Sequence, residues 1–303
     1  MILRFLVACL VCCISATSLE AGIWDKLKSV FVSDENAEAP TIRVLIMHDA
    51  PYADIEVKGT YNLYDPYKNK RIATRFAAKG NRMHALSQGL KWGEEFPGVY
   101  QIAIFPDDRD ISVSINGTDY RGKVYVYDIG GTISIVNEVE IEDYLASMMP
   151  NKFNRAITEE GLAAAVIAER THAFHLSMYS ENPYWHVRAV DVGYQGCDSE
   201  NSDQRITEAL ASTRYMVMSK TGVYEGIVTP FPVHLVTGKN DLHYRNLAKI
   251  SIDDIEVMSH QGDNAAKILA KSFPDASIEI MTGPHNKKDH VAQVKVTDYT
   301  STR

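Results

Sequence analysis

Between Thr41 and about Asn137 the chain consists of short runs in which apolar and polar residues alternate. The six runs, separated by Asp-Pro, Asn-Gly and Gly-Gly signals, read IRVLIMH, ADIEVKG, VYQIAIF, ISVSING, GKVYVYD and TISIVNE. A period of two is typical of half-buried strands, and Asn-Gly and Gly-Gly pairs favour the tight turns of hairpins. The pattern therefore predicts a β-rich part over residues 41–137, with hairpin turns at Asn116-Gly117 and Gly130-Gly131.

After Glu140 the period of the sequence becomes helical. Helices are predicted over residues 142–149 and 158–179, and the second has an N-cap, Thr158, followed by two acidic residues that suit the helix dipole. Ile157 and Leu162 stand at the spacing of a hydrophobic staple. The residues of this long helix expected to face the core are Leu162, Val166, Ala173 and Leu176.

Further elements are expected in the last third of the chain. These are a helix at about 202–213, two strand-like runs within 215–236 with a turn at Thr221-Gly222, a helix near 264–273, and strands at SIEIM and VAQVKV. The predicted fold class is α+β, in which the β-rich part packs against the long central helix and against further helices and strands.

Composition and charge exclude one class of partner. The 303 residues are 45% hydrophobic and 23% charged, which is ordinary for a chain with a buried core. The formal net charge is −8, whereas a nucleic-acid-binding protein would show a basic domain or stripe. No nucleic-acid partner and no cofactor are therefore expected.

The N-terminus, MILRFLVACLVCCISATSLEA, has the form of a secretory signal peptide over residues 1–21. A basic residue, Arg4, precedes an apolar run that ends in small residues, and cleavage is expected after Ser18 or Ala21. Two alternatives remain open, an uncleaved signal anchor and a lipoprotein acylated at Cys9 or Cys13. In each case the protein is expected to cross the cytoplasmic membrane and to be periplasmic or associated with the envelope.

Residues 22–40 are expected to form a short amphipathic helix followed by a polar linker that ends in proline, and no catalysis is expected there. Three of the four cysteines, Cys9, Cys12 and Cys13, lie in the signal segment. The mature chain keeps Cys197 and therefore has neither an internal disulfide nor a cysteine zinc cluster.

Residues 120–174 resemble the SpoIID/LytB family of sporulation and cell-wall proteins. The family pattern is a strand ending in "vvNevplEdYL", then "vvpsEm", then "EAlkAQAvaARTya". The matching residues are Val136, Asn137, Glu138, Val139, Glu142, Asp143, Tyr144, Leu145, Pro150, Glu160, Leu162, Ala164, Ala168, Arg170, Thr171 and Ala173. The match is colinear and without gaps, so residues 41–303 are interpreted as a SpoIID-like domain. Its parts are 41–137, a helical, catalytic-like core at 138–240, and a C-terminal part at 241–303 that is short of the family's last segment.

The resemblance implies a protein that binds peptidoglycan glycan strands in cell-wall remodelling, division or sporulation-like processes. Other cell-wall enzymes or division proteins are further partners that it suggests. Active members of the family are lytic transglycosylases, in which one carboxylic acid protonates the glycosidic oxygen and then takes a proton from the muramyl C6 hydroxyl. The family's acid is the Glu of "vvpsEm", and Lys152 occupies that position in this chain.

The lysine leaves the identity of a catalytic residue unknown. A lysine with the ordinary pKa of about 10.4 is a sluggish acid at neutral pH, and it serves as a base only after a large desolvation shift. A nearby carboxylate is the alternative, and the candidates are Glu159, Glu160, Glu142 and Asp143. Each also has a structural interpretation, since all four occupy the first turns of predicted helices.

The residues expected to bind substrate are Lys152, Arg170, Tyr194 and His234. For Arg170 the two interpretations are pairing with a buried carboxylate and presentation of its guanidinium to a muramyl carboxylate or glycan hydroxyl. Tyr194 and Trp185 are candidates for stacking on sugar rings or for core packing. The pairs His172 with His175 and His234 with His243 lack a third ligand, so no metal site is expected.

Two hypotheses follow from these residues. The first is a non-catalytic protein that binds glycan strands, with weak or no cleavage, because the acid is replaced and because the family's Gly-Gly-Thr segment is degenerate at Thr237-Gly238-Lys239. The alternative is an active lytic transglycosylase, forming anhydromuropeptides, that uses a displaced carboxylate.

Overall fold

The computed structural model describes residues 39–74, 81–153, 157–197, 203–220, 228–236 and 248–281, together with the backbone of 294–295. The signal segment, the helix expected within 22–38, the Thr221-Gly222 turn, Gly238-Lys239 and His243 lie outside these residues. Within them, no helix is both long enough and apolar enough to cross a membrane.

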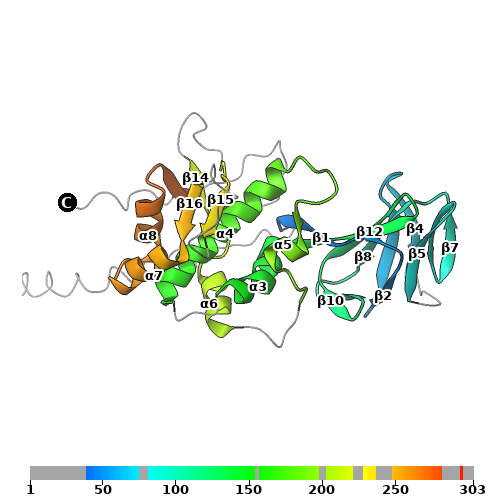
Figure 1. Cartoon of the computed structure of the whole chain (residues 1–303), viewed down its shortest axis with the longest axis horizontal. Helices are drawn as coiled ribbons and strands as arrows, with labels where there is room; N and C mark the ends of the chain where they lie inside the picture. Colours follow the sequence, from blue (N-terminus) through cyan, green and yellow to red (C-terminus); the bar gives the residue numbers. More distant parts are fainter. Residues whose placement is uncertain are drawn as a thin grey trace, which may run out of the picture. The chain divides into compact units, whose positions relative to one another are not determined.

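The N-terminal part forms two sheets (Figure 1). A seven-stranded sheet has the order β13-β1-β12-β11-β8-β3-β4, and a six-stranded sheet has the order β10-β9-β2-β5-β6-β7. The strands are β1 (Thr41–Ala50), β2 (Ala53–Val57), β3 (Tyr61–Asp65), β4 (Lys70–Thr74), β5 (Arg82–Leu86), β6 (Gly89–Trp92), β7 (Glu94–Pro97), β8 (Gln101–Pro106), β9 (Val113–Ile115), β10 (Thr118–Tyr120), β11 (Lys123–Ile129), β12 (Thr132–Glu140) and β13 (Val187–Arg188). The prediction of an α+β fold with a β-rich N-terminal part is confirmed.

Both predicted hairpin turns are present. Asn116 and Gly117 join β9 to β10 with φ of 50° and 87°, and Gly130 and Gly131 join β11 to β12 with φ of 66° and 92°. Two successive positive φ values are the signature of the turn that matches the right-handed twist of the strands, and Asn and Gly adopt them at the lowest cost. The six predicted runs correspond to β1, β2, β8, β9, β11 and β12, while the short strands between them were not predicted.

The C-terminal part contributes helices and two small sheets. The helices are α3 (Ile141–Lys152), α4 (Glu159–Tyr179), α5 (Ala189–Val192), α6 (Gln204–Ser212), α7 (Ile252–His260) and α8 (Ala265–Ser272), of which α5 and α7 were not predicted. β14 (Met216–Lys220) pairs with β17 (Ala276–Ile280), which pairs with β18 (Val294–Lys295), and β15 (Val233–Val236) pairs in parallel with β16 (Ala248–Ser251).

Helix α4 is the predicted long helix, and its start is fixed as expected. The Thr158 hydroxyl accepts a hydrogen bond from the Gly161 backbone amide at 3.1 Å, which satisfies one of the free donors of the first turn. Of the expected core positions, Leu162, Val166 and Ala173 are buried and Leu176 is half-buried.

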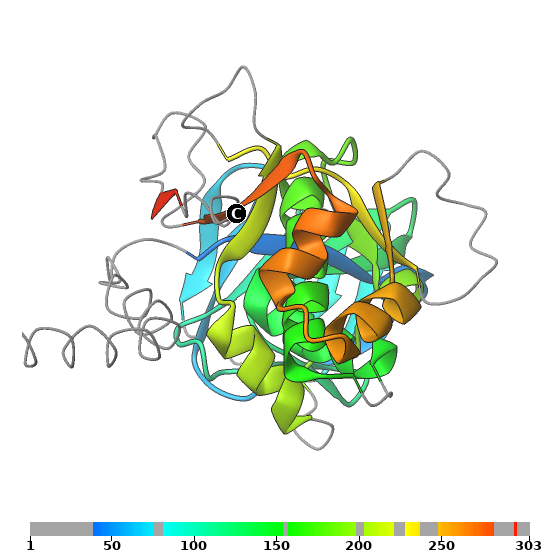
Figure 2. The ribbon, with the colours of Figure 1, turned by 90° about the vertical axis from the view of Figure 1, so that its left-hand side faces the viewer.

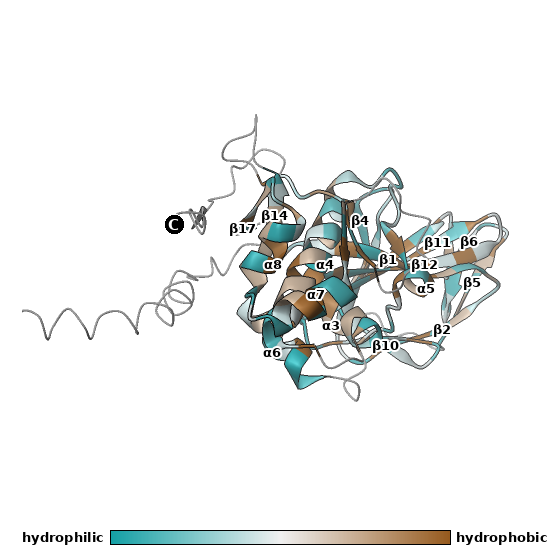
Figure 3. Ribbon diagram, turned by 60° about the vertical axis from the view of Figure 1, so that its left-hand side comes forward, coloured by the Kyte–Doolittle hydropathy of each residue, from teal (hydrophilic) through white to brown (hydrophobic). Residues whose placement is uncertain are grey.

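The surroundings of α4 explain its alanine-rich sequence. It contacts β14 and β15, the helices α3, α6, α7 and α8, and strand β1 of the large sheet. Figure 2 shows α7 and α8 in front of α4, and Figure 3 shows that α7 and α8 carry both apolar and polar residues. Small side chains let several elements approach one helix closely, so α4 is buried around most of its circumference.

Candidate functional site

Lys152, which the sequence resemblance aligns with the family's acid, is the last residue of α3. Its ammonium donates a hydrogen bond to the Glu169 carboxylate, in the middle of α4, across 2.8 Å. The Lys152 side chain is 25% exposed and the Glu169 side chain 7% exposed. The ion pair therefore lies at the surface with its carboxylate side turned inwards.

The C-terminal half of α3 is held in place by backbone groups of the segment that follows α5. Asn151 donates a hydrogen bond from its amide to the Gly193 carbonyl at 2.8 Å, and the Ser147 hydroxyl accepts one from the Gln195 backbone at 3.1 Å. These contacts fix the end of the helix that presents Lys152.

One histidine, His172, lies near the ion pair, and two others lie near His172. Burial lowers the pKa of His172 to about 4; the charge of Glu169 opposes the shift, and the charges of Lys152, His175 and His234 add to it. The Nδ1 atom of His172 is buried, and no hydrogen-bond partner for it occurs among the described residues. We call Lys152, Glu169, His172, His175 and His234 the Lys152 cluster.

The remaining members of the cluster come from α4 and β15. The His175 ring lies 3.2 Å, through Nδ1, from the Pro230 carbonyl, and it contacts the Tyr179 ring at 5.0 Å between centroids. His234 is half-buried on β15. In the described part of the chain, no group of three or more His, Cys, Asp or Glu side chains is arranged to hold a metal ion.

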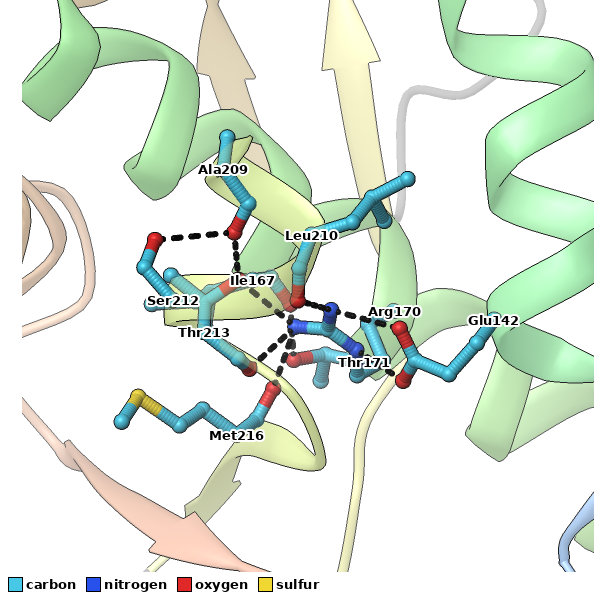
Figure 4. A network of polar contacts seen from close by, with 9 residues as sticks. All are labelled: Glu142, Ile167, Arg170, Thr171, Ala209, Leu210, Ser212, Thr213 and Met216. Atoms are coloured by element: carbon cyan, nitrogen blue, oxygen red, sulfur yellow. Dashed lines mark hydrogen bonds and ion pairs between the residues drawn. The ribbon is translucent and has the colours of Figure 1, made fainter. Parts of the chain in front are cut away.

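Arg170 was expected either to bind substrate or to pair with a carboxylate, and in the structure it pairs with a carboxylate. Its side chain is fully buried, and it forms a bidentate ion pair with Glu142 on α3 at 2.8 and 2.9 Å (Figure 4). Its other N–H groups donate to the carbonyls of Thr213, Met216 and Leu210. Arg170 is therefore corrected from a substrate ligand to a structural residue, because its donors are occupied and solvent does not reach it.

Tyr194 is also engaged inside the protein. Its hydroxyl donates a hydrogen bond to the Asn137 side chain at 2.7 Å, and Asn137 in turn donates to the carbonyls of Arg121 and Lys123. Burial raises the pKa of the Tyr194 phenol well above its ordinary value. The expectation that Tyr194 stacks on a sugar is corrected to a role in the core.

Three of the four candidate carboxylates are paired with other groups of the protein, and the fourth is exposed. Glu142 pairs with Arg170, and Asp143 lies 3.5 Å from the Arg121 guanidinium. Glu160 accepts a hydrogen bond at 2.7 Å from the Ala265 backbone at the start of α8. Glu159 is exposed in the first turn of α4.

Sequence reasoning missed Glu169, the carboxylate that does contact Lys152. It stands where the family pattern has the first alanine of "ARTya". In this chain it directly follows AAAVIA, a run of small and apolar residues. A carboxylate on the buried face of such a helix needs a partner. This feature of the sequence could have predicted a cation close to Glu169 in the fold.

The chain is similar to a known protein family and to several known proteins. Residues 130–219 match the model of the family described as "SpoIID: Stage II sporulation protein". An uncharacterized protein of Chlamydia pneumoniae is 30% identical over 269 residues, which cover 87% of this chain and 90% of the relative. One of Chlamydia muridarum is 30% identical over 80% of this chain and 78% of its own length. One of Brachyspira hyodysenteriae is 28% identical over 59% of this chain and 47% of its own length.

Proposed function

The chain belongs to the SpoIID family, and from this premise we propose that it binds the glycan strands of peptidoglycan and has weak or no cleavage activity of its own. Family membership supports a cell-wall related role. The observation that supports the finer proposal is the ion pair between Lys152 and Glu169, because Lys152 is the residue that the sequence resemblance aligns with the family's acid.

The ion pair favours binding over acid catalysis. The Lys152 ammonium already donates a hydrogen bond to the Glu169 carboxylate at 2.8 Å, so this donor is engaged inside the protein rather than directed at a glycosidic oxygen. The same reaction needs a base in its second step, and a protonated lysine cannot accept a proton. A partly exposed cation does suit the muramyl and stem-peptide carboxylates of a wall fragment.

The proposal includes export. The signal-like segment at residues 1–21 supports a place outside the cytoplasmic membrane, where peptidoglycan is found. Mass spectrometry of the protein recovered from an envelope fraction tests this step, and an intact Met1 on cytosolic protein contradicts it.

The test of binding is co-sedimentation of the full chain with purified sacculi, run beside an assay for released muropeptides. We expect the wild type to sediment and to release no anhydromuropeptides. Lys152→Met should bind about tenfold more weakly, since a charged contact contributes about 1.5–3 kcal/mol. The matched control is Lys58→Met. It removes another ion-paired lysine, in the connection between β2 and β3, and should leave binding unchanged.

One observation favours a second candidate, an active lytic transglycosylase with a displaced acid. Glu169 places a carboxylate oxygen within hydrogen-bonding distance of the Lys152 ammonium, so the site retains a carboxylate although its position on the chain has changed. If this candidate is right, the wild type releases anhydromuropeptides and Glu169→Gln abolishes the release. Absence of release from a wild type that binds sacculi eliminates it.

A further inference from the structure

Six aromatic side chains form a continuous row outside the Lys152 cluster. The successive ring centroids are 4.7 Å apart for Tyr64 and Phe105, 6.1 Å for Phe105 and Tyr125, 6.3 Å for Tyr125 and Tyr127, 5.1 Å for Tyr127 and Tyr184, and 6.4 Å for Tyr184 and Trp185. We call these six residues the aromatic row. Each spacing lies in the range at which aromatic rings attract one another.

The register of the seven-stranded sheet places the first four rings on one face. Tyr64 on β3 is opposite Ala103 on β8, which is opposite Tyr125 on β11. Phe105 and Tyr127 stand two residues from Ala103 and Tyr125 respectively, and residues two apart on a strand share a face. The row thus crosses β3, β8 and β11 and continues onto the segment that precedes β13.

Core packing accounts for part of the row. Tyr125 and Tyr127 are buried in a small core cluster with Leu45, Ala103 and Val136, and Tyr64, Phe105 and Trp185 pack against this cluster. Tyr64 and Phe105 remain half-buried, and Tyr184 is 44% exposed. The outer rings therefore present apolar surface to solvent on both sides of a buried floor, which is typical of an interaction surface.

Charged groups stand beside the rings. The Arg43 guanidinium lies 5.3 Å from the centre of the Tyr125 ring and the Lys123 ammonium 5.0 Å from that of Phe105. Both cations share one carboxylate, Glu138, at 2.8 and 3.5 Å. The two cations and one carboxylate leave one positive charge in excess, and the Arg43 and Lys123 side chains are 33% and 37% exposed.

We propose that the aromatic row is a second carbohydrate-binding surface, which holds a peptidoglycan glycan strand apart from the Lys152 cluster. Pyranose rings have apolar C–H faces that stack on flat aromatic rings, while their hydroxyls accept hydrogen bonds from cations such as Lys123 and Arg43. The excess positive charge suits the carboxylates of muramyl groups and stem peptides. This inference rests on the proposed function, because it assigns the same polymer to a second surface.

The choice of a glycan over a protein partner rests on the kind of surface. The exposed apolar groups are aromatic rings with hydroxyls at their edges, and charged donors lie within one side-chain length of them. An apolar peptide would find few aliphatic contacts on such a surface, whereas a sugar uses both the ring faces and the donors.

The test uses paired tyrosine substitutions in the full chain. Tyr64→Ser with Tyr184→Ser removes one ring at each end of the row, and sedimentation with sacculi should become about tenfold weaker. Tyr67→Ser with Tyr100→Ser removes two other exposed tyrosines, 82% and 49% exposed, which lie outside the row, and should bind as the wild type does. Thermal unfolding of both double variants establishes that they are folded.

A second measurement starts from the wild type and does not depend on the folding of the double variants. Peptide-free glycan strands, prepared by amidase treatment, should change the tryptophan fluorescence of the wild type, and Trp185→Phe should remove that change. If the wild type sediments with sacculi and the Tyr64/Tyr184 double variant binds equally well, the proposal that the aromatic row binds glycan is wrong, while the proposed function stands. Failure of the wild type to sediment overturns the proposed function and this inference with it.

Discussion

Arg170 and Glu142 form a bidentate ion pair, 2.8 and 2.9 Å long, between the middle of α4 and the first turn of α3. The same guanidinium donates to carbonyls at the end of α6 and at the start of β14. One fully buried side chain thus joins four elements, and its geometry is that of a structural tie.

Removing this tie should destabilise the fold. We expect Arg170→Met to lower the free energy of unfolding by about 3–5 kcal/mol, because it leaves a carboxylate and several buried carbonyls without their donor. The control Arg188→Met removes an exposed arginine, paired with Asp191 at 3.8 Å, and should change stability by less than about 0.5 kcal/mol. Urea unfolding measures both, and equal midpoints for Arg170→Met and the wild type contradict the structural role.

Glu160 provides a second structural prediction. Its carboxylate accepts a hydrogen bond from the Ala265 backbone at the start of α8, so Glu160→Ala should lower the free energy of unfolding by about 1 kcal/mol. Glu159→Ala, at the neighbouring exposed position, should cost less than about 0.5 kcal/mol. Neither variant should alter muropeptide release. Equal urea midpoints for Glu160→Ala and the wild type contradict this structural role.

The parts of the fold that sequence predicted are those with local signals. The Asn116-Gly117 and Gly130-Gly131 turns require positive φ, and α4 begins at a capping threonine, so neighbouring residues specify each of them. Short strands such as β5 and β6 have weak alternation and depend on their partners in the sheet.

The site was harder to predict because its geometry is tertiary. Nothing near Arg170 in the sequence indicates that the carbonyls of Thr213 and Met216 close around its guanidinium, more than 40 residues away. Glu169 was overlooked for the same reason: Lys152 lies 17 residues before it, across the connection between α3 and α4. The sequence predicted the helix, and the packing of α3 against α4 defined the ion pair.

His172 predicts a pH dependence of stability. Burial lowers the pKa of its imidazole to about 4, whereas the unfolded chain keeps a value near 6.5. Between these values the unfolded state binds the extra proton, so this histidine makes stability fall as pH decreases from about 6.5 to about 4, by about 2–3 kcal/mol in total.

The measurement is urea unfolding of the wild type and of His172→Phe between pH 7.5 and about 4. Other groups of the protein also bind protons in acid, so the wild type has several causes of acid destabilisation. The difference between the two proteins isolates the histidine. We expect the stability of His172→Phe relative to the wild type to rise as pH falls below about 6.5. Parallel curves for the two proteins contradict the lowered pKa.

The last prediction concerns the charge arrangement of Lys152 and Glu169. Lys152→Glu alone places two carboxylates side by side, so we expect a loss of about 2–4 kcal/mol in stability. Lys152→Glu with Glu169→Ala instead reproduces the family pattern at both positions, removes the like-charge contact and returns one carboxylate to the end of α3. If the rest of the site is intact, this double variant should regain stability and release anhydromuropeptides under conditions in which the wild type releases none. Glu169→Ala alone supplies the control, because it leaves Lys152 without its carboxylate and adds no acid. Muropeptide analysis by mass spectrometry measures the release.

A double variant that is folded and sediments with sacculi, yet releases nothing, shows that the site lacks more than its acid. The degenerate Thr237-Gly238-Lys239 segment then becomes the next target for substitution.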